Sequence, residues 1–406
     1  MTLADLLKKK TLVALGLNSG TSADGLDMTA LTITKDKNQS VTYRLESGRS
    51  QAYPAKLRNE ILAFSNEDAP QLSRQMYLDQ TLGRFYGRTA VSFIRRLAKQ
   101  GIIVDVIGSH GQTVRHLPQR AKYLGAVVNG TLQLGSLEQI AEQTGKVVCG
   151  DFRQADIALG NEGAPITVAA MNYLFSDRDE SRLIVNIGGI ANYFYFPAGS
   201  SAHKINAADS GPGNSLSDLL SLKLFNEKYD RSGRHASAGK VSVPLLNILK
   251  RHSFFRSKNI STGREEFGAE LLKQALAYAK THSLKKDDII ATLSELTVHG
   301  ILASIKPLIA KDNNIKKLYL TGGGIRNKFF VRRLVQELPE LTIEPIDNLG
   351  VPTQWVEAAA YAVMAERTVR SAPMPTNYSG GGRVKQMAVL GKIAQPPVSV
   401  VKAGIK

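Results

Sequence analysis

The sequence predicts an α/β protein with two domains, and three observations carry this prediction. The chain has 406 residues, which is more than a single domain of ordinary size contains. Short apolar segments alternate with longer segments of helical periodicity, a pattern typical of α/β folds. Two glycine turns, each between two predicted strands, lie about half a chain apart and suggest two halves of related architecture.

The composition is that of a globular protein, with 43% hydrophobic and 21% charged residues. A net charge of +17 suits an acidic ligand such as a nucleotide, and is also compatible with nucleic-acid binding. The lysines form short clusters, and no stripe of arginine and aromatic residues indicates a nucleic-acid groove. We therefore expect most of them on a solvated surface.

The single cysteine, Cys149, excludes an intrachain disulfide and a multi-cysteine metal site, and it fits a reducing cytoplasm. Its neighbours Val147 and Val148 predict a buried strand and an inert thiol. Residues 8–15 only loosely imitate a signal peptide, because a glycine turn follows where a cleavage site would stand. No run reaches the ~18 apolar residues of a membrane span, so we expect a soluble cytoplasmic protein.

Two segments share a strand–turn–strand plan: residues 12–34, with a turn at 18–25, and residues 183–196, with a turn at Gly188-Gly189. Between them we expect helices at 55–65, 71–99 and 132–144, and strands at 102–107 and 146–149. Further on we expect a strand at 317–321 and helices at 215–228, 242–251, 265–281, 287–310, from 328, and at 354–369. The basic tail from residue 371 has an apolar stretch, 387–390, that we expect to return to the core.

One carboxylate stands directly before a stiff turn, since Asp209 precedes Ser210-Gly211-Pro212-Gly213-Asn214. We expect Asp209 on a loop just ahead of the helix at 215–228. Glycine allows close approach of the backbone to a ligand and proline fixes one φ, so this turn would hold a catalytic base in place. A plain helix cap by Asp209 or Ser210 is the alternative.

Three glycine-rich loops are candidates for binding a nucleotide. Gly20-Thr21-Ser22-Ala23-Asp24-Gly25 joins two strands, so its amides and hydroxyls can face a phosphate, with Asp24 and Asp27 as the nearest carboxylates for Mg²⁺. The turn at 186–192 offers similar donors, and Gly322-Gly323-Gly324 stands between a strand and a helix. None of these is a Walker A or Rossmann pattern, and each taken alone is equally compatible with an ordinary turn.

The order of these features is that of the actin, hexokinase and heat-shock ATPase superfamily. Within it, the chain resembles the anhydro-N-acetylmuramic acid kinase family from near its start to about residue 370. The segments that carry this resemblance are residues 19–27, 108–116, 151–153, 163–165, 186–189, 209–214, 261–265 and 322–324. The family usually has Gly-Gln where this chain has Asn161-Glu162, and the added carboxylate near the sugar pocket bears on which sugar is accepted.

The resemblance implies two actin-like (ribonuclease H-like) domains with a nucleotide cleft between them. The expected N-terminal domain covers residues 1–155 and is rejoined by 371–406, and the C-terminal domain covers 156–370. The resemblance also implies ATP and Mg²⁺ as cofactors, with Asp24 at the metal, and a homodimer without nucleic-acid or membrane partners.

The activity implied is an ATP-dependent kinase that opens the 1,6-anhydro bridge of anhydro-N-acetylmuramic acid and phosphorylates O6. Its product, N-acetylmuramic acid 6-phosphate, belongs to peptidoglycan recycling. In the family, the residue at the position of Asp209 is the base that activates water for attack on C1. ATP and its phosphates would contact Gly20, Thr21, Ser22, Ala23, Asp24, Gly25, Asp27, Gly188, Gly189, Gly211, Gly213, Asn214, Gly322, Gly323 and Gly324.

The sugar-binding candidates are Thr113, Asp151, Arg153 and Glu357, with His110 and Arg115 as alternatives in the same loops. A cationic Arg153 suits a lactyl carboxylate on the sugar, whereas a salt bridge to Asp151 or Asp156 is its structural alternative. Glu357 opens a helix, where compensation of the helix dipole is the alternative to a sugar contact.

Three other functions stay open from the sequence. The first is a kinase for another anhydrosugar such as levoglucosan. The second is an actin-like or chaperone-like ATPase that works through a protein partner. The third is a nucleic-acid binder, suggested by charge alone.

Overall fold

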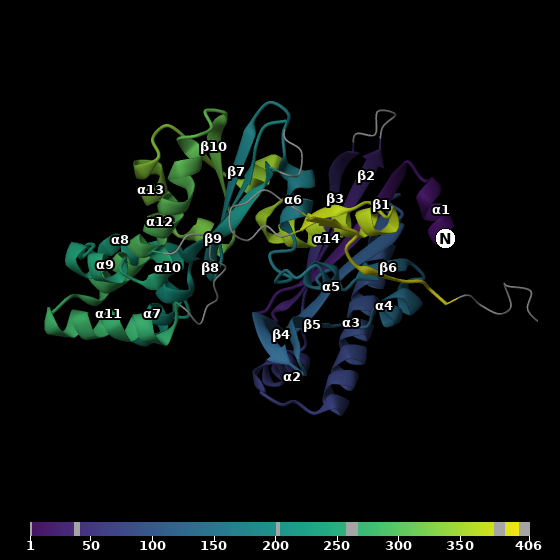
Figure 1. The fold of residues 1–406 in the computed structure, drawn as a ribbon, viewed down its shortest axis with the longest axis horizontal. Helices are drawn as coiled ribbons and strands as arrows, with labels where there is room; N and C mark the ends of the chain where they lie inside the picture. Colours follow the sequence, from purple (N-terminus) through teal and green to yellow (C-terminus); the bar gives the residue numbers. More distant parts are fainter. Residues whose placement is uncertain (1, 36–40, 200–203, 257–266, 377–385, 398–406) are drawn as a thin grey trace, which may run out of the picture. The chain divides into compact units, whose positions relative to one another are not determined.

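The chain folds into two compact α/β units (Figure 1). The structure is a computed structural model and describes residues 2–35, 41–199, 204–256, 267–376 and 386–397. Unit 1 consists of Met1–Leu174, Gly350–Asn377 and Lys385–Lys406, and unit 2 of Phe175–Leu349 and Tyr378–Val384. The motif at residues 261–265 lies outside the described residues.

Unit 1 is built on a mixed sheet of strand order β14-β6-β4-β1-β2-β3, with β5 paired to β4. Its strands are β1 (Thr11–Ser19), β2 (Gly25–Lys35), β3 (Val41–Ala52), β4 (Val106–Tyr123), β5 (Ala126–Leu134), β6 (Val147–Gly150) and β14 (Lys392–Ala394), with a separate pair β12 (Met374–Thr376) and β13 (Gln386–Ala388). Its helices are α1 (Leu3–Lys8), α2 (Ala55–Asn66), α3 (Leu72–Ala98), α4 (Leu137–Thr144), α5 (Gln154–Ala158) and α14 (Val356–Val369), and α6 (Val168–Phe175) ends at the border with unit 2.

Helix α14 lies directly on the sheet of unit 1 because two glycines make room for its backbone. Gly16 of β1 and Gly108 of β4 are paired neighbours in the two parallel strands. A Cβ atom at Gly16 would lie 1.7 Å from the carbonyl oxygen of Ala358, and one at Gly108 would lie 2.0 Å from that of Tyr361. Any side chain at these positions would therefore push the helix off the sheet.

This packing explains why the unit borders differ from the predicted borders at residues 155 and 370. Helix α14, predicted for the C-terminal domain, belongs to unit 1 because its backbone is seated on β1 and β4. Residues 156–174 also belong to unit 1. Strand β14 pairs with β6 and Leu390 is buried, so the chain after α14 does return to the core of this unit.

Unit 2 is built on a sheet of order β11-β10-β7-β8-β9. Its strands are β7 (Ser181–Ile187), β8 (Ile190–Phe196), β9 (Asn206–Pro212), β10 (Ile315–Thr321) and β11 (Thr342–Pro345). Its helices are α7 (Ser215–Phe225), α8 (Arg234–Ala238), α9 (Val243–Leu249), α10 (Ser253–Arg256), α11 (Ala269–Thr281), α12 (Lys286–Ile309) and α13 (Lys328–Glu337).

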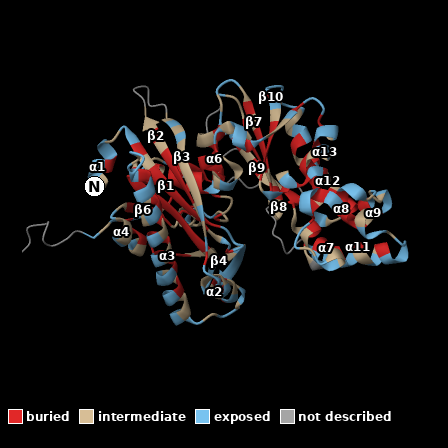
Figure 2. Cartoon of the chain, turned by 180° about the vertical axis from the view of Figure 1, so that it is seen from behind, coloured by how far each residue is buried: buried red, intermediate tan, exposed pale blue. Residues whose placement is uncertain are grey.

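Helix α12 is the central helix of unit 2. It is long and apolar enough to cross a membrane by length and composition, contrary to the expectation that no segment would be. However, 78% of its most apolar window is buried, and Figure 2 shows it as largely interior. Packing in the core of unit 2 accounts for its apolar character.

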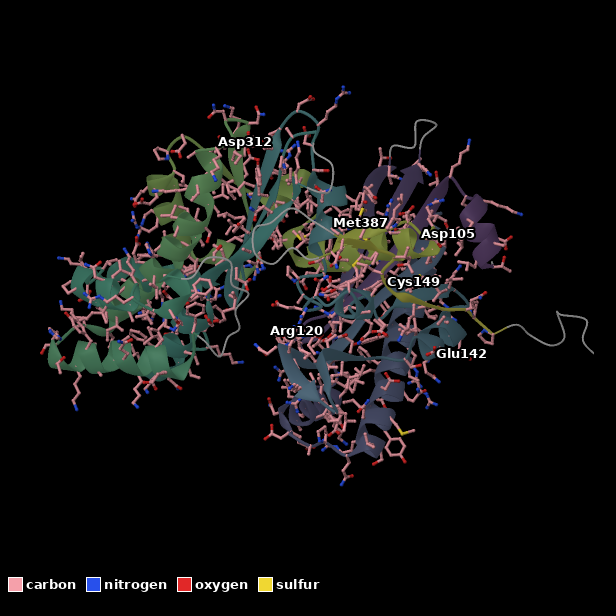
Figure 3. The ribbon with its side chains drawn as sticks, viewed as in Figure 1. Asp105, Arg120, Glu142, Cys149, Asp312 and Met387 are labelled. Carbon is pink, nitrogen blue, oxygen red and sulfur yellow. The ribbon has the colours of Figure 1, made fainter. Side chains whose placement is uncertain are left out.

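Several predicted elements differ from the structure in informative ways. The helix expected at 132–144 begins only at Leu137, because residues 126–134 form β5 and pair with β4. The strand expected at 102–107 begins at Val106 and runs on to Tyr123. Cys149 lies on β6 as expected (Figure 3). It is fully buried, and burial raises the pKa of its thiol to about 12.

Candidate functional site

The turn between β1 and β2 is fixed by hydrogen bonds to a side chain of β4 and is otherwise mostly exposed to solvent. The side-chain amide of Gln112 donates to the carbonyl of Gly20 over 3.1 Å, and Ser19 Oγ donates to Gln112 Oε1 over 2.6 Å. Gly20, Thr21 and Ser22 are exposed, and the atom nearest to a Cβ at Gly20 would be Ser22 Oγ, 3.8 Å away. The backbone of this turn is therefore open to a ligand.

Ala23 was predicted to contact phosphate, but its backbone amide forms a hydrogen bond within the turn. Ala23 is buried, and its N–H donates to the carbonyl of Gly20 over 3.1 Å. This bond closes the turn. Ala23 therefore shapes the loop, and a phosphate would meet the exposed residues beside it.

Two carboxylates flank the same turn. Asp24 is exposed, with one oxygen 3.4 Å from the guanidinium of Arg58, and Asp27 accepts a hydrogen bond from Ser50 Oγ over 2.5 Å. Burial, opposed by the Ser50 bond and assisted by the charge of Asp24, raises the pKa of Asp27. The described residues contain no group of three or more metal-ligating side chains. A cation here would thus depend on one or two carboxylates, water and phosphate oxygens, which is how Mg²⁺ is commonly bound.

A second cluster in unit 1 forms around Arg153, just after β6. Its Nε and one terminal nitrogen lie 3.1 and 3.0 Å from His110 Nε2, and the other terminal nitrogen donates to the carbonyl of Gly163 over 2.6 Å. His110 stacks on Tyr361 of α14, with ring centroids 4.7 Å apart. Residues from β4, the loop after β6 and α14 thus meet at one place.

Glu357 belongs to the same cluster, because it stands one turn before Tyr361 on α14. Asn18, at the end of β1, donates to Glu357 Oε2 over 2.7 Å. The side chain of Glu357 keeps contact with solvent, yet the protein around it is dense enough that desolvation raises its pKa. The hydrogen bond from Asn18 and the charge of Arg153 oppose that rise, so Arg153 and Glu357 interact electrostatically.

The other sugar-binding candidates have different partners. Asp151 forms an ion pair of 2.6 Å with Lys392 of β14, and Thr113 Oγ1 accepts a hydrogen bond from Gln133. Arg115 donates to the backbone carbonyl of Glu67, and this contact holds its guanidinium at the end of α2. The structure therefore brings together Arg153, His110 and Glu357, while Asp151, Thr113 and Arg115 engage neighbouring loops and strands.

The loop at residues 161–163 is fixed by Asp156, which is buried. One of its oxygens accepts the N–H of Gly163 over 2.8 Å, and the other accepts the side-chain amide of Asn161 over 3.1 Å. Asp156 thereby holds the carbonyl of Gly163 in reach of Arg153. Burial and the charge of Asp156 raise the pKa of Glu162, the residue that departs from the family pattern.

In unit 2, Asp209 lies within strand β9, which corrects the prediction that it sits on a loop. It is half-buried and pairs in register with Asn192 of β8. Helix α12 packs against the same strand, because a Cβ at Gly300 would lie 2.1 Å from the carbonyl oxygen of Ser210. Asp209 is therefore fixed from two sides.

The turn after Asp209 is hydrogen-bonded to the turn between β7 and β8. The amides of Gly213 and Asn214 donate to the carbonyls of Gly189 and Gly188 over 2.9 and 2.7 Å. The side chain of Asn214 donates to the carbonyls of Ile187 and Gly188. Gly213 and Asn214, predicted as phosphate ligands, thus use these donors to hold the second hairpin turn beside β9.

The three glycines after β10 differ in the space that surrounds them. Gly322 has φ +84°, and Cβ atoms at Gly322 and Gly324 would lie 2.4 Å from Asn186 Oδ1 and 2.3 Å from Ile187 Cγ2. These two glycines allow close packing on the end of β7. Gly323 is exposed, and a Cβ there would meet nothing nearer than Asn214 Nδ2 at 3.8 Å. Of the three, Gly323 leaves open backbone for a ligand.

Comparison with known proteins decides the family. The family model described as anhydro-N-acetylmuramic acid kinase matches residues 12–396. The chain belongs to this family. Proteins of that name from Salinibacter ruber and Shewanella denitrificans are 33% and 36% identical to it, over 96% and 93% of this chain and 98% and 96% of theirs. A solved structure, component A of (R)-2-hydroxyglutaryl-CoA dehydratase from Acidaminococcus fermentans, aligns over 88% of this chain and 99% of its own with 11% identity and a TM-score of 0.42.

Membership in the anhydro-N-acetylmuramic acid kinase family confirms the predicted fold class and makes the chain an ATP-dependent sugar kinase. Of the functions left open by the sequence, family membership favours the sugar kinase over the chaperone-like ATPase and the nucleic-acid binder. Each residue role in the reaction remains a prediction.

The sequence analysis gave no individual role to four site residues: Asn18, Gln112 and Asn192, which lie in segments it singled out, and Tyr361, which does not. Tyr361 had a usable signal, because it follows Glu357 by four residues and so shares its face of α14. Asn192 is recognised only once Asn206–Pro212 is known to pair with β8.

Proposed function

We propose that the chain opens the 1,6-anhydro bridge of anhydro-N-acetylmuramic acid with water and transfers the γ-phosphoryl group of ATP to O6. Asp209 accepts a proton from water while the water oxygen bonds to C1. The C1–O6 bond breaks, and the electron pair left on O6 attacks the γ-phosphorus. The bond from that phosphorus to the β–γ bridging oxygen breaks, and ADP leaves. The products are N-acetylmuramic acid 6-phosphate and ADP.

The observation that carries this proposal is the setting of Asp209. Its strand is paired to β8 on one side and packed against Gly300 of α12, and the turn that follows is bonded to Gly188 and Gly189. A base held so firmly next to a glycine hairpin suits a reaction in which positioning supplies much of the rate enhancement. Asn192, the residue paired with Asp209, has a buried Oδ1 without a hydrogen-bond partner among the described residues and offers a further ligand contact.

The exposed turn at Gly20, Thr21 and Ser22 supports a role in phosphate binding, and Gly188 and Gly323 support the same role in unit 2. A Cβ atom at Gly20 or Gly323 would meet nothing nearer than 3.8 Å, and one at Gly188 would make an ordinary contact of 3.4 Å with the carbonyl oxygen of Ile190. When bound, Mg²⁺ would offset charge on the phosphates of ATP. Asp24 would hold it directly or through water, and Asp27 stands nearby as the second carboxylate.

We assign Arg153 to the acidic group of the sugar. The lactyl carboxylate of muramic acid calls for a planar, charged donor, which a guanidinium supplies. Glu357, on the same cluster, would accept hydrogen bonds from sugar hydroxyl groups. Thr113 and Asp151 stay candidates for outer contacts with the sugar.

The proposal extends to the setting of the enzyme: a cytoplasmic homodimer that serves peptidoglycan recycling, as the family resemblance implies. Sedimentation velocity over a range of concentrations tests the dimer. A single monomeric species throughout would contradict it.

The reaction itself is tested with a set of sugars and labelled water. Anhydro-N-acetylmuramic acid, its counterpart without the lactyl group, levoglucosan and free N-acetylmuramic acid are each incubated with ATP and magnesium. With ¹⁸O-water and prompt fragmentation of the product, we expect label on C1 and none in the phosphate ester. A product labelled nowhere, or a preference for levoglucosan, would overturn the proposal.

A further inference from the structure

His110 has an unusual environment for a histidine near a sugar site. It is 7% exposed, and its ring lies nearly parallel to that of Tyr361, at 22°. Its Nε2 faces two nitrogens of Arg153, at 3.0 and 3.1 Å. A guanidinium has only donors, so Nε2 must accept and carry no proton.

This arrangement excludes the ordinary roles of an active-site histidine. Burial, followed by the positive charge of Arg153, lowers the pKa of His110 to about 3. The imidazole is neutral at physiological pH, and its Nε2 lone pair is already in use. His110 is thus not a proton shuttle, and its Nε2 is not an open acceptor for a sugar hydroxyl.

We propose that His110 is a positioning residue, which accepts two N–H groups of Arg153 and so fixes the direction in which Arg153 meets the acidic group of the sugar. This inference rests on the proposed function, which gives Arg153 that ligand. The carbonyl of Gly163 holds the other terminal nitrogen of the guanidinium over 2.6 Å, and Asp156 holds Gly163. The plane of the guanidinium is therefore set from two sides.

The acceptor on His110 matters more than its volume. Arginine is selective for carboxylates because its planar guanidinium presents donors in a fixed arrangement. A guanidinium that is free to rotate loses part of this selectivity. Without Nε2, one side of the guanidinium would lose its fixed partner. The consequence should appear with sugars that carry a carboxylate and be small with sugars that lack one.

The test uses two variants of nearly equal size, His110→Gln and His110→Met, in the full-length enzyme. Glutamine places an acceptor oxygen near the position of Nε2, and methionine does not. KM and kcat are measured for anhydro-N-acetylmuramic acid and for the same anhydrosugar without its lactyl group. We expect His110→Met to raise KM for the carboxylated sugar ~10-fold, with His110→Gln within ~3-fold of the parent, as for a weakened charge-assisted hydrogen bond.

Arg153→Met on the same two sugars separates the inference from the proposed function. If Arg153→Met weakens both sugars equally, then Arg153 does not read the carboxylate and the proposed function is wrong at this point. If Arg153→Met discriminates between the sugars and His110→Met does not, the positioning role alone fails.

A measurement on the unaltered enzyme guards against variants that do not fold. In ¹⁵N-histidine NMR spectra, His110 should show an unprotonated Nε2 and no titration between pH 5 and 8. The signal is recognised by its Nε2 coupling across the hydrogen bond to ¹⁵N-labelled arginine. A histidine that titrates in this range while coupled to Arg153 would overturn the proposal.

Discussion

Asn18 Nδ2 donates to Glu357 Oε2 over 2.7 Å, which ties the end of β1 to the first turn of α14. The two residues are 339 positions apart in the chain. One oxygen of Glu357 is thereby engaged, and the side chain still contacts solvent. Asn18 sets where this carboxylate lies, and the other oxygen is the one we assign to the sugar.

Glu357→Gln should keep the bond to Asn18 but remove the negative charge. A hydrogen bond to a charged group is worth ~1.5–3 kcal/mol, so KM for the sugar should rise at least ~10-fold. KM for ATP should change little. Steady-state kinetics with Glu142→Gln, an exposed carboxylate on α4, provides the matched control. Unchanged sugar kinetics would show that Glu357 does not bind the sugar and serves instead to compensate the dipole of α14.

Asp209→Asn should abolish most turnover while leaving the strand pairing of β9 intact. Loss of a general base costs ~10²–10⁴-fold in rate, so kcat should fall by that factor. ATP binding, measured by calorimetry, should be preserved. The exposed Asp179→Asn is the control, and near-normal turnover of Asp209→Asn would mean that another group activates water.

Alanine substitution of two neighbouring glycines should affect different properties: ATP affinity at Gly323 and stability at Gly322. Gly323→Ala adds a methyl group in open space, so ATP affinity should drop ~10-fold with the melting temperature unchanged. Gly322→Ala forces a left-handed φ and a clash with Asn186, so it should cost ~1–3 kcal/mol of stability. Calorimetric titration and thermal melting of both variants separate the two effects. Tight ATP binding by Gly323→Ala would contradict the assignment.

The low pKa of His110 predicts a loss of stability in mild acid. The unfolded chain takes up a proton near pH 6.5, whereas the folded one resists until about pH 3. The contribution of His110 is therefore complete above pH 6.5 and is lost as pH falls toward 3. Between pH 7 and 5, the unfolding free energy of the parent should drop by ~2 kcal/mol more than that of His110→Gln.

Urea unfolding at both pH values measures this difference, with the exposed His282→Gln as control. His116 and His299, whose pKa values burial also lowers, are present in both proteins and cancel in the comparison. Equal losses in parent and variant would show that His110 is protonated as easily in the folded state as in the unfolded one.

Much of the fold could be predicted from local patterns. Alternating apolar residues and glycine turns located β1–β2 and β7–β8, and helical periodicity located α3, α12 and α14. Strand β9 could not be predicted in this way, because Asn206–Pro212 consists of small and polar residues with a glycine and a proline. Its strand conformation comes from pairing with β8, a tertiary contact that outweighs local preference.

Several members of the candidate site were proposed from the sequence, but the contacts that connect them were not. A guanidinium suited to a carboxylate pointed to Arg153, and the family motif contained His110. That His110 accepts from Arg153 depends on the parallel pairing of β4 with β6, which brings residues 43 positions apart together. Likewise, the sequence offered three glycines at 322–324, and only the packing against Ile187 singles out Gly323.

The seat of α14 on Gly16 and Gly108 also determines when the enzyme can become competent during its synthesis. Residues 1–174 emerge from the ribosome first, with His110 and Arg153 already present but without Glu357 and Tyr361. Residues 175–349, the main part of unit 2, are then made before the chain returns to unit 1 at residue 350. Until α14 docks, the apolar strands beneath it stand uncovered, and the first unit to be translated is the last to be finished.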